Sequence, residues 1–267
     1  MKDNVNKVYK KIIKLIDSSS YNPDISLIYS SMDVTDLSSA STEKNIEELC
    51  MGIIADASLF SYPAAVCFYP SKLDAAFKIL KDTPVKIATV AAGFPHGQVG
   101  LQTKVFEIKE LIDRGVDEID IVLNVPHAIQ GDLDKITKEL MAIKSNMKNA
   151  KLKVILEVSI LNSIDLVYKV SQMCLNAGVD CIKTSTGKEG SLATPEAAIT
   201  MCMAIQEYYE RSGQKRTMKV AGGISDIPTA SLYVEIVREV LGQEWLNPDL
   251  FRIGASRLRT TIIESLK

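Results

Sequence analysis

DRGVDEIDIV (Asp113–Val122) and NAGVDCIKTS (Asn176–Ser185) are two stretches of the chain that follow one pattern. In each, a glycine suited to end a helix is followed by Val-Asp and then by a short run typical of a strand. Further along each run stands a charged side chain, Asp120 in the first and Lys183 in the second. The pattern predicts two helix-to-strand junctions, each followed by a strand with a charged side chain at the equivalent position along its length.

The alternation of strand and helix continues outward from these two stretches. We expect strands at Ser26–Asp33, Ala64–Pro70, Val85–Gly93, Glu118–Asn124, Leu152–Ser159, Asp180–Thr186, Met218–Gly223 and Leu250–Ser256. We expect helices near Thr42–Ala57, Ser71–Lys81, Leu101–Arg114, Asp132–Asn149, Ser163–Ala177, Thr194–Arg211, Ile227–Leu241 and Arg257–Leu266. Eight such units predict an α/β protein with a single (β/α)8 TIM barrel, and an open sheet is the alternative if one strand is wrongly assigned.

The N-terminal segment differs from the repeating units. Its apolar residues are interspersed with lysines, which predicts a surface helix rather than a membrane span. We therefore expect a helical extension over residues 1–24 and one barrel domain over residues 25–267.

Composition and charge exclude several classes of function. The chain has 267 residues, of which 46% are hydrophobic, and its formal net charge is −2. This balance provides no basic field for nucleic acid or for an anionic membrane. The five cysteines are odd in number and scattered, which favours a reducing compartment and a cytoplasmic protein. The two histidines stand in no zinc-binding spacing, so we expect no metal site.

Three charged side chains are expected inside the barrel. Successive side chains of a strand point to opposite faces, so Asp120 lies on the inner face when the apolar Ile119 and Ile121 face the helices. The same alternation places Lys183 and Lys219 on the inner faces of their strands. A buried ion pair that only fixes packing is the structural alternative. The three residues are expected near the carboxyl ends of their strands, where TIM-barrel active sites lie. Two neighbouring ammonium groups lower each other's pKa, which leaves one amine neutral and able to form a Schiff base.

Glycine-containing turns follow the last three expected strands. They are TGK (Thr186–Lys188), AGGIS (Ala221–Ser225) and IGAS (Ile253–Ser256). Taken singly, each is an ordinary loop, but on adjacent strands they predict a phosphate site, because glycines let backbone N–H groups approach the oxygens.

Several motifs together resemble the class I deoxyribose-phosphate aldolases. They are ATVAAGFPHG (Ala88–Gly97), VDEIDIVLN (Val116–Asn124), VDCIKTSTGK (Val179–Lys188), KVAGGIS (Lys219–Ser225) and RIGAS (Arg252–Ser256). The resemblance begins at about Ser26 and runs to the C-terminus. The sequence departs from that family's pattern at Val220 and Arg257.

The resemblance implies reversible cleavage of 2-deoxy-D-ribose 5-phosphate to acetaldehyde and D-glyceraldehyde 3-phosphate, without a metal or an organic cofactor. It implies that Lys183 forms the imine, that Lys219 lowers the pKa of that amine and that Asp120 moves protons. It assigns the phosphate to Gly187, Lys188, Gly222, Gly223, Gly254 and Ser256. It makes His96 a loop-positioning residue, and we interpret Cys67 as a small core residue. It leaves a homodimer or a homotetramer open.

Two other interpretations differ in what they predict. Another Schiff-base or phosphate-binding barrel, such as a transaldolase-like enzyme or a sugar-phosphate isomerase, would place its reactive group elsewhere. A non-catalytic aldolase-like barrel would act by binding a protein partner, for instance through Met1–Asp24. The joint presence of Lys183, Lys219 and Asp120 favours the aldolase.

Overall fold

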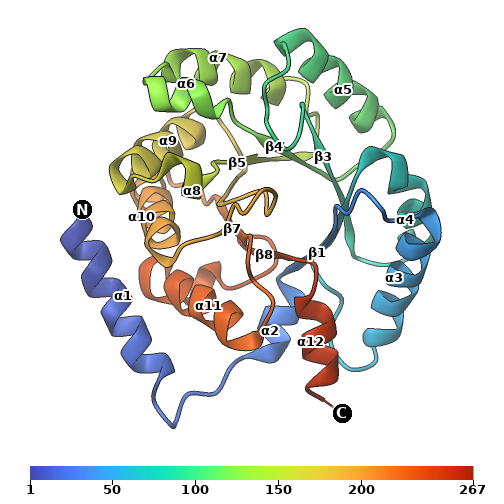
Figure 1. Cartoon of the computed structure of the whole chain (residues 1–267), viewed down its shortest axis with the longest axis horizontal. Helices are drawn as coiled ribbons and strands as arrows, with labels where there is room; N and C mark the ends of the chain where they lie inside the picture. The colour runs from blue at the N-terminus through green and yellow to red at the C-terminus, as the bar shows by residue number, and fades with distance from the viewer. Residues whose placement is uncertain (267) are drawn as a thin grey trace.

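The chain folds into a closed barrel of parallel strands surrounded by helices (Figure 1). The computed structural model describes residues 1–266. The strands follow one another around the barrel in sequence order, and β1 closes it by pairing with β8. They are β1 (Met32–Asp36), β2 (Ala65–Phe68), β3 (Lys86–Ala91), β4 (Glu118–Val122), β5 (Lys151–Ile155), β6 (Cys181–Lys183), β7 (Thr217–Ala221) and β8 (Phe251–Ala255). The predicted TIM barrel is confirmed.

The helices form the outer layer. They are α1 (Lys2–Ile16), α2 (Ile25–Ser30), α3 (Glu43–Asp56), α4 (Leu73–Leu80), α5 (Leu101–Asp113), α6 (Val125–Gln130), α7 (Leu133–Lys144), α8 (Val158–Leu161), α9 (Ile164–Asn176), α10 (Pro195–Ser212), α11 (Ile227–Leu241) and α12 (Leu258–Glu264). Two short 3-10 turns accompany them, η1 (Pro70–Lys72) and η2 (Gln243–Trp245). The eight helices expected from the sequence are present, with ends shifted by a few residues.

Local sequence explains where these helices begin. The side chains of Thr42, Ser163, Thr194 and Asp226 each accept a hydrogen bond from a backbone N–H of the first turn. The apolar faces of the helices then pack on the outward side chains of the strands. Ile119 and Ile121 of β4 are fully buried in this layer, as the alternation predicts. The inner face of the same strand is thereby left to Asp120 and its neighbour on that face, Glu118.

The N-terminal helix α1 lies outside the ring, against α10 and α11 (Figure 1). Its side chains Val5 and Ile12 are buried there, and Lys11 forms an ion pair with Glu239 of α11 at 2.6 Å. The predicted surface helix is therefore present, and it is amphipathic.

Some expected strands were wrong in extent. Most of Ser26–Asp33 is the helix α2, capped by the Asp24 side chain, and the first strand begins only at Met32. Similarly, the expected strand Leu152–Ser159 ends at Ile155, and its last residues enter α8. The short β-branched runs that suggested strands fit equally well into short buried helices.

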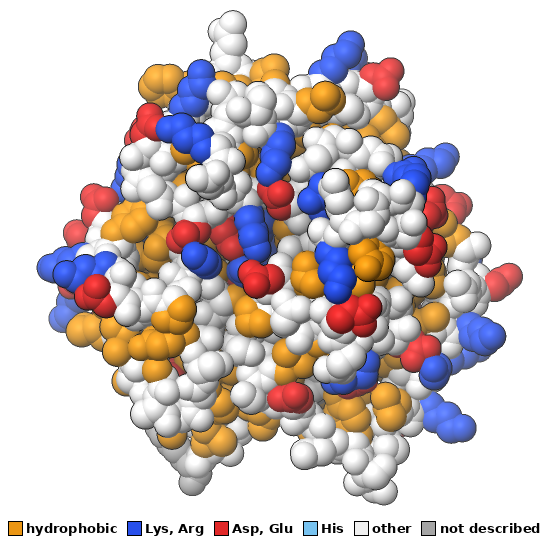
Figure 2. Space-filling model, turned by 180° about the vertical axis from the view of Figure 1, so that it is seen from behind, with side chains coloured by type: hydrophobic (Ala, Val, Ile, Leu, Met, Phe, Trp, Pro, Cys, Tyr) orange, Lys and Arg blue, Asp and Glu red, His pale blue; other side chains and the backbone are white. Residues whose placement is uncertain are grey.

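Both charge signs are distributed over the surface. Figure 2 shows the face opposite to that of Figure 1, where Lys and Arg side chains alternate with Asp and Glu and neither sign covers the face. This agrees with the formal net charge of −2. Among the residues that the structure describes, we find no helix with both the length and the apolar character needed to cross a membrane.

Candidate active site

One cavity of about 330 Å³ opens at the carboxyl ends of β6, β7 and β8. Lys183 lines this cavity. The six residues predicted to hold phosphate, Gly187, Lys188, Gly222, Gly223, Gly254 and Ser256, line it too. The structure therefore brings the expected reactive lysine and the expected anion site together around one space.

The three residues predicted to be catalytic form a hydrogen-bonded group. Lys183 Nζ donates to Asp120 Oδ2 at 2.8 Å, and Lys219 Nζ donates to the same oxygen at 2.9 Å. Lys183 and Lys219 are partners in the register of β6 and β7, which turns both side chains into the barrel side by side. The side chain of Lys183 is only 3% exposed, and those of Asp120 and Lys219 are fully buried.

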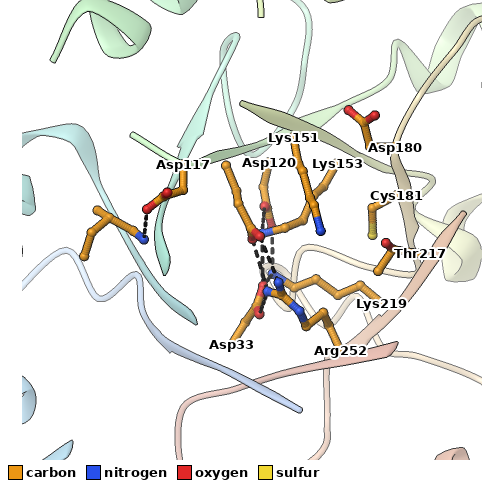
Figure 3. A network of polar contacts seen from close by, with 12 residues as sticks. Asp33, Asp117, Asp120, Lys151, Lys153, Asp180, Cys181, Thr217, Lys219 and Arg252 are labelled. Atoms are coloured by element: carbon orange, nitrogen blue, oxygen red, sulfur yellow. Dashed lines mark hydrogen bonds and ion pairs between the residues drawn. The ribbon is translucent and has the colours of Figure 1, made fainter. Parts of the chain in front are cut away.

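Further charges lie next to this group, as Figure 3 shows for Asp33, Lys153 and Arg252. Lys153 of β5 donates to Asp120 Oδ1 at 2.9 Å and to Asp33 Oδ2 at 3.0 Å. Arg252 of β8 donates to Asp33 Oδ1 at 2.6 Å and to Glu118 Oε1 at 2.8 Å. Lys219 also donates to Asp33.

These further charged residues were not among the site residues predicted from the sequence. Glu118 shares a strand face with Asp120, and Lys153 and Arg252 are charged residues flanked by apolar ones within expected strands. That same signal had identified Lys183, so it could have found them. Asp33 lay at the end of a strand that was placed too early.

Electrostatic attraction decides the ionisation of the buried carboxyl and ammonium groups. Burial by itself would raise the pKa of Asp120, but Lys153, Lys183 and Lys219 hold it well below its usual range. Burial would lower the pKa of Lys219, yet Asp120 and Asp33 raise it above its usual value. Asp120 is therefore a carboxylate and Lys219 an ammonium at neutral pH.

The charges balance without Lys183. Among the described residues, the cluster contains the carboxylates of Asp33, Glu118 and Asp120 and the cations of Lys153, Lys219 and Arg252, besides Lys183 itself. A proton on Lys183 adds a positive charge that no further carboxylate of the cluster offsets. A buried charge without a compensating partner is costly in free energy.

The glycines of the cavity have steric reasons to be there. Gly222 has φ +94°, and a Cβ on it would lie 2.6 Å from the carbonyl oxygen of Ser191. A Cβ on Gly254 would lie 3.0 Å from Lys219 Cε, so this glycine leaves room for the lysine side chain. Lys188 donates a hydrogen bond to the carbonyl of Leu37 at the rim. These positions leave the backbone accessible to an anion.

Two residues noted in the sequence lie at the edge of this arrangement. Cys67 of β2 is fully buried, and burial raises the pKa of its thiol to about 11. The exposed His96 lies 3.5 Å from Glu189 in the loop after β6. Within residues 1–266, we find no group of three or more His, Cys, Asp or Glu side chains that could hold a metal ion.

Comparison with known proteins places the chain in a family. A model of the DeoC/LacD family aldolases matches residues 26–260. Deoxyribose-phosphate aldolase of Homo sapiens is 38% identical over 246 residues, which cover 86% of this chain and 77% of that protein. The mouse (Mus musculus) protein of the same name has the same identity and coverage.

Solved structures share the fold of this chain. The structure of QR15, an aldolase, is 28% identical in sequence and has a TM-score of 0.73, and the match covers 90% of this chain and 96% of that one. The deoxyribose phosphate aldolase from Aeropyrum pernix has the same fold, with a TM-score of 0.73 at 22% identity, over 98% of this chain and 97% of that one. With the family model matching most of its length, the chain belongs to the DeoC/LacD family aldolases.

Proposed function

We propose that this aldolase cleaves 2-deoxy-D-ribose 5-phosphate reversibly to acetaldehyde and D-glyceraldehyde 3-phosphate through an imine on Lys183. The observation that carries the proposal is the position of Lys183. Its amine lies in a charge-balanced cluster and lines the same cavity as the glycine-containing turns. That cavity gives an aldehyde carbon access to the amine and a phosphate access to backbone N–H groups.

The chemistry follows from this placement. The neutral amine of Lys183 attacks C1 of the open-chain sugar, and loss of water leaves an imine. The imine takes up a proton and becomes an iminium. A base then removes the proton of the C3 hydroxyl, and the C2–C3 bond breaks as its electron pair moves toward the iminium nitrogen. C3 leaves as the aldehyde carbon of D-glyceraldehyde 3-phosphate. Protonation at C2 and hydrolysis release acetaldehyde and restore Lys183.

Asp120 and Lys219 supply the proton transfers in this proposal. Asp120 is ionised and bonded to both lysines, so it can accept a proton, directly or through water. Lys219 is protonated, so it can donate one. Gly187, Lys188, Gly222, Gly223, Gly254 and Ser256 bind the phosphate in the proposal.

The setting of the protein forms part of the proposal. All five cysteines are free and buried, which supports a reducing compartment such as the cytoplasm. Cleavage of a deoxyribose phosphate there belongs to the breakdown of deoxyribonucleotides. We treat residues 1–24 as an accessory extension of a barrel domain over residues 25–267, since α1 packs on the outer helices α10 and α11.

The experiment is a cleavage assay on the purified protein. With 2-deoxy-D-ribose 5-phosphate and no added metal, acetaldehyde and glyceraldehyde 3-phosphate should appear in equal amounts. Lys183→Met should abolish both products, while Lys151→Met, at the opposite end of β5, should leave them unchanged. Absence of cleavage by the wild-type protein would overturn the proposal.

A further inference from the structure

A buried carboxylate beside the cavity has no role in the chemistry described above. Glu157 follows β5 and is only 5% exposed. It lines a smaller adjoining cavity of about 140 Å³ rather than the one that contains Lys183. Its backbone is in the left-handed region, at φ 55° and ψ 57°, although it is not a glycine. Such backbone strain persists where surrounding contacts hold a residue in place, and it is frequent at functional sites.

Among the residues that the structure describes, the hydrogen bonds of the Glu157 carboxylate all reach one loop. Its Oε1 accepts the backbone N–H of Thr186 at 2.5 Å and the hydroxyl of Ser191 at 2.8 Å. Its Oε2 accepts the hydroxyl of Thr186 at 3.1 Å. One side chain therefore holds both ends of the loop 186–191, which follows β6.

This loop carries two of the proposed phosphate-binding residues. Gly187 and Lys188 lie between the two points that Glu157 holds, and the Thr186 hydroxyl in turn accepts the N–H of Lys188 at 3.1 Å. The far end of the loop packs on Gly222, where the Ser191 carbonyl leaves no room for a Cβ. A displacement of the loop would therefore shift the phosphate-binding residues that follow β6 and also disturb those that follow β7.

We propose that Glu157 is a positioning residue that holds the loop 186–191 in the geometry that binds phosphate, and so determines the preference for phosphorylated over unphosphorylated sugars. The proposal rests on the proposed function. Glu157 makes no direct contact with Lys183, Asp120 or Lys219 among its hydrogen bonds. Its effect is consequently confined to the phosphate end of the substrate.

The test compares two substrates on two variants. Glu157→Ala removes all three hydrogen bonds, whereas Glu157→Gln keeps an oxygen for the Thr186 N–H and the Ser191 hydroxyl. Both substitutions leave a non-glycine residue in the strained position, so the backbone cost is similar. Glu157→Ala should raise the KM for 2-deoxyribose 5-phosphate about tenfold or more, since each hydrogen bond to a charged group contributes substantially. Glu157→Gln should stay within about threefold of the wild type.

Cleavage of unphosphorylated 2-deoxyribose separates a positioning role from a general structural defect, because a general defect would lower the rate on this substrate as well. Its kcat/KM should remain within about twofold of the wild-type value in Glu157→Ala. Asp180→Ala is the matched control. The Asp180 carboxylate also accepts a hydrogen bond from a backbone N–H, that of Leu152 at 2.8 Å, but Asp180 precedes β6 and so lies at the end of the barrel away from the cavity. That variant should have a lower free energy of unfolding, but the ratio of kcat/KM for the phosphorylated sugar to kcat/KM for the unphosphorylated sugar should not change. An equal loss on both substrates in Glu157→Ala, or an unchanged KM, would overturn the proposal.

Two measurements keep the test decisive if a step fails. Should Glu157→Ala not fold, Ser191→Ala removes one of the three hydrogen bonds and should raise the same KM by a smaller factor; an unchanged KM in Ser191→Ala would contradict the proposal. Should the wild-type protein show no cleavage, the proposed function fails by itself. Protection by inorganic phosphate against thermal unfolding then still compares the variants, and equal protection of wild type and Glu157→Ala would refute the positioning role.

Discussion

Replacement of Lys219 by leucine separates a charge effect on Lys183 from a role in proton transfer. Lys219 and Lys183 donate to the same oxygen of Asp120. The positive and negative charges of the whole cluster are equal in number only when Lys183 is neutral. Lys219→Leu removes one positive charge. The cluster then balances with a protonated Lys183, which cannot attack an aldehyde. Imine formation should therefore slow at neutral pH and recover as the pH rises.

The size of the effect follows from the geometry. Two donors on one oxygen stand about 4 to 5 Å apart, and unit charges at that separation interact by about 4 kcal/mol at an effective dielectric constant of about 20. One pH unit corresponds to about 1.4 kcal/mol. Asp33 also loses a partner in the variant, and a proton taken up by Asp33 would remove a negative charge and offset part of the change. We therefore expect the acidic limb of the pH–rate profile to move upward by about two pH units.

The assay is the initial rate of imine formation with acetaldehyde across the pH range, measured for wild type and Lys219→Leu. Lys151→Leu is the control, because it removes the same charge from β5 at a side chain that is 40% exposed and bonded to Asp249 instead. Its profile should coincide with that of the wild type. A Lys219→Leu profile that is lowered uniformly but not displaced would refute the charge effect and leave Lys219 as a proton donor or an orienting group.

Four further predictions follow from other parts of the site. Lys183→Arg should fold but lose about 10⁴-fold or more in kcat, because a guanidinium does not become a neutral nucleophile; circular dichroism and the cleavage assay check this. Gly222→Ala should raise the KM for the phosphorylated substrate, because the new Cβ meets the Ser191 carbonyl; a wild-type KM would contradict it. Treatment with EDTA should leave the rate unchanged, since the iminium is the electron sink; loss of activity that zinc restores would disprove this. Arg252→Met should lower the free energy of unfolding by about 3 kcal/mol at pH 7, because it leaves the buried carboxylates of Asp33 and Glu118 with one cation fewer. The pKa of Glu118 is lowered in the fold, so its stabilisation is present above about pH 4 and is lost below; denaturation by urea should therefore show a smaller deficit for Arg252→Met in acid than at pH 7.

The barrel could be predicted because its repeating unit is visible in the sequence. The glycines before β4 and β6, and the apolar partners of Asp120 and Lys183, indicated both the junctions and the direction of the side chains. The first unit was misassigned where a capped helix, Ile25–Ser30, contains the same apolar residues as a short strand. The cap at Asp24 was the available signal against a strand.

Some contacts of the site could not be predicted from the sequence, for a physical reason. That Lys153 and Arg252 share partners with Lys219 depends on the stagger of strands far apart in the chain, which alternation alone does not give. Glu157 stands where its strand turns into α8 through a left-handed residue. Side-chain polarity does not indicate such a turn at a glutamate, so its contacts with the loop after β6 emerged only from the structure.

The most direct test of the central claim is the location of the covalent intermediate. The wild-type protein is incubated with acetaldehyde and borohydride, digested, and examined by mass spectrometry. Reduction of the imine should leave an ethyl group on the Lys183 nitrogen, and this label should be absent from Lys183→Arg. A label on Lys153 or Lys219 in place of Lys183, or undiminished cleavage by Lys183→Arg, would contradict the assignment.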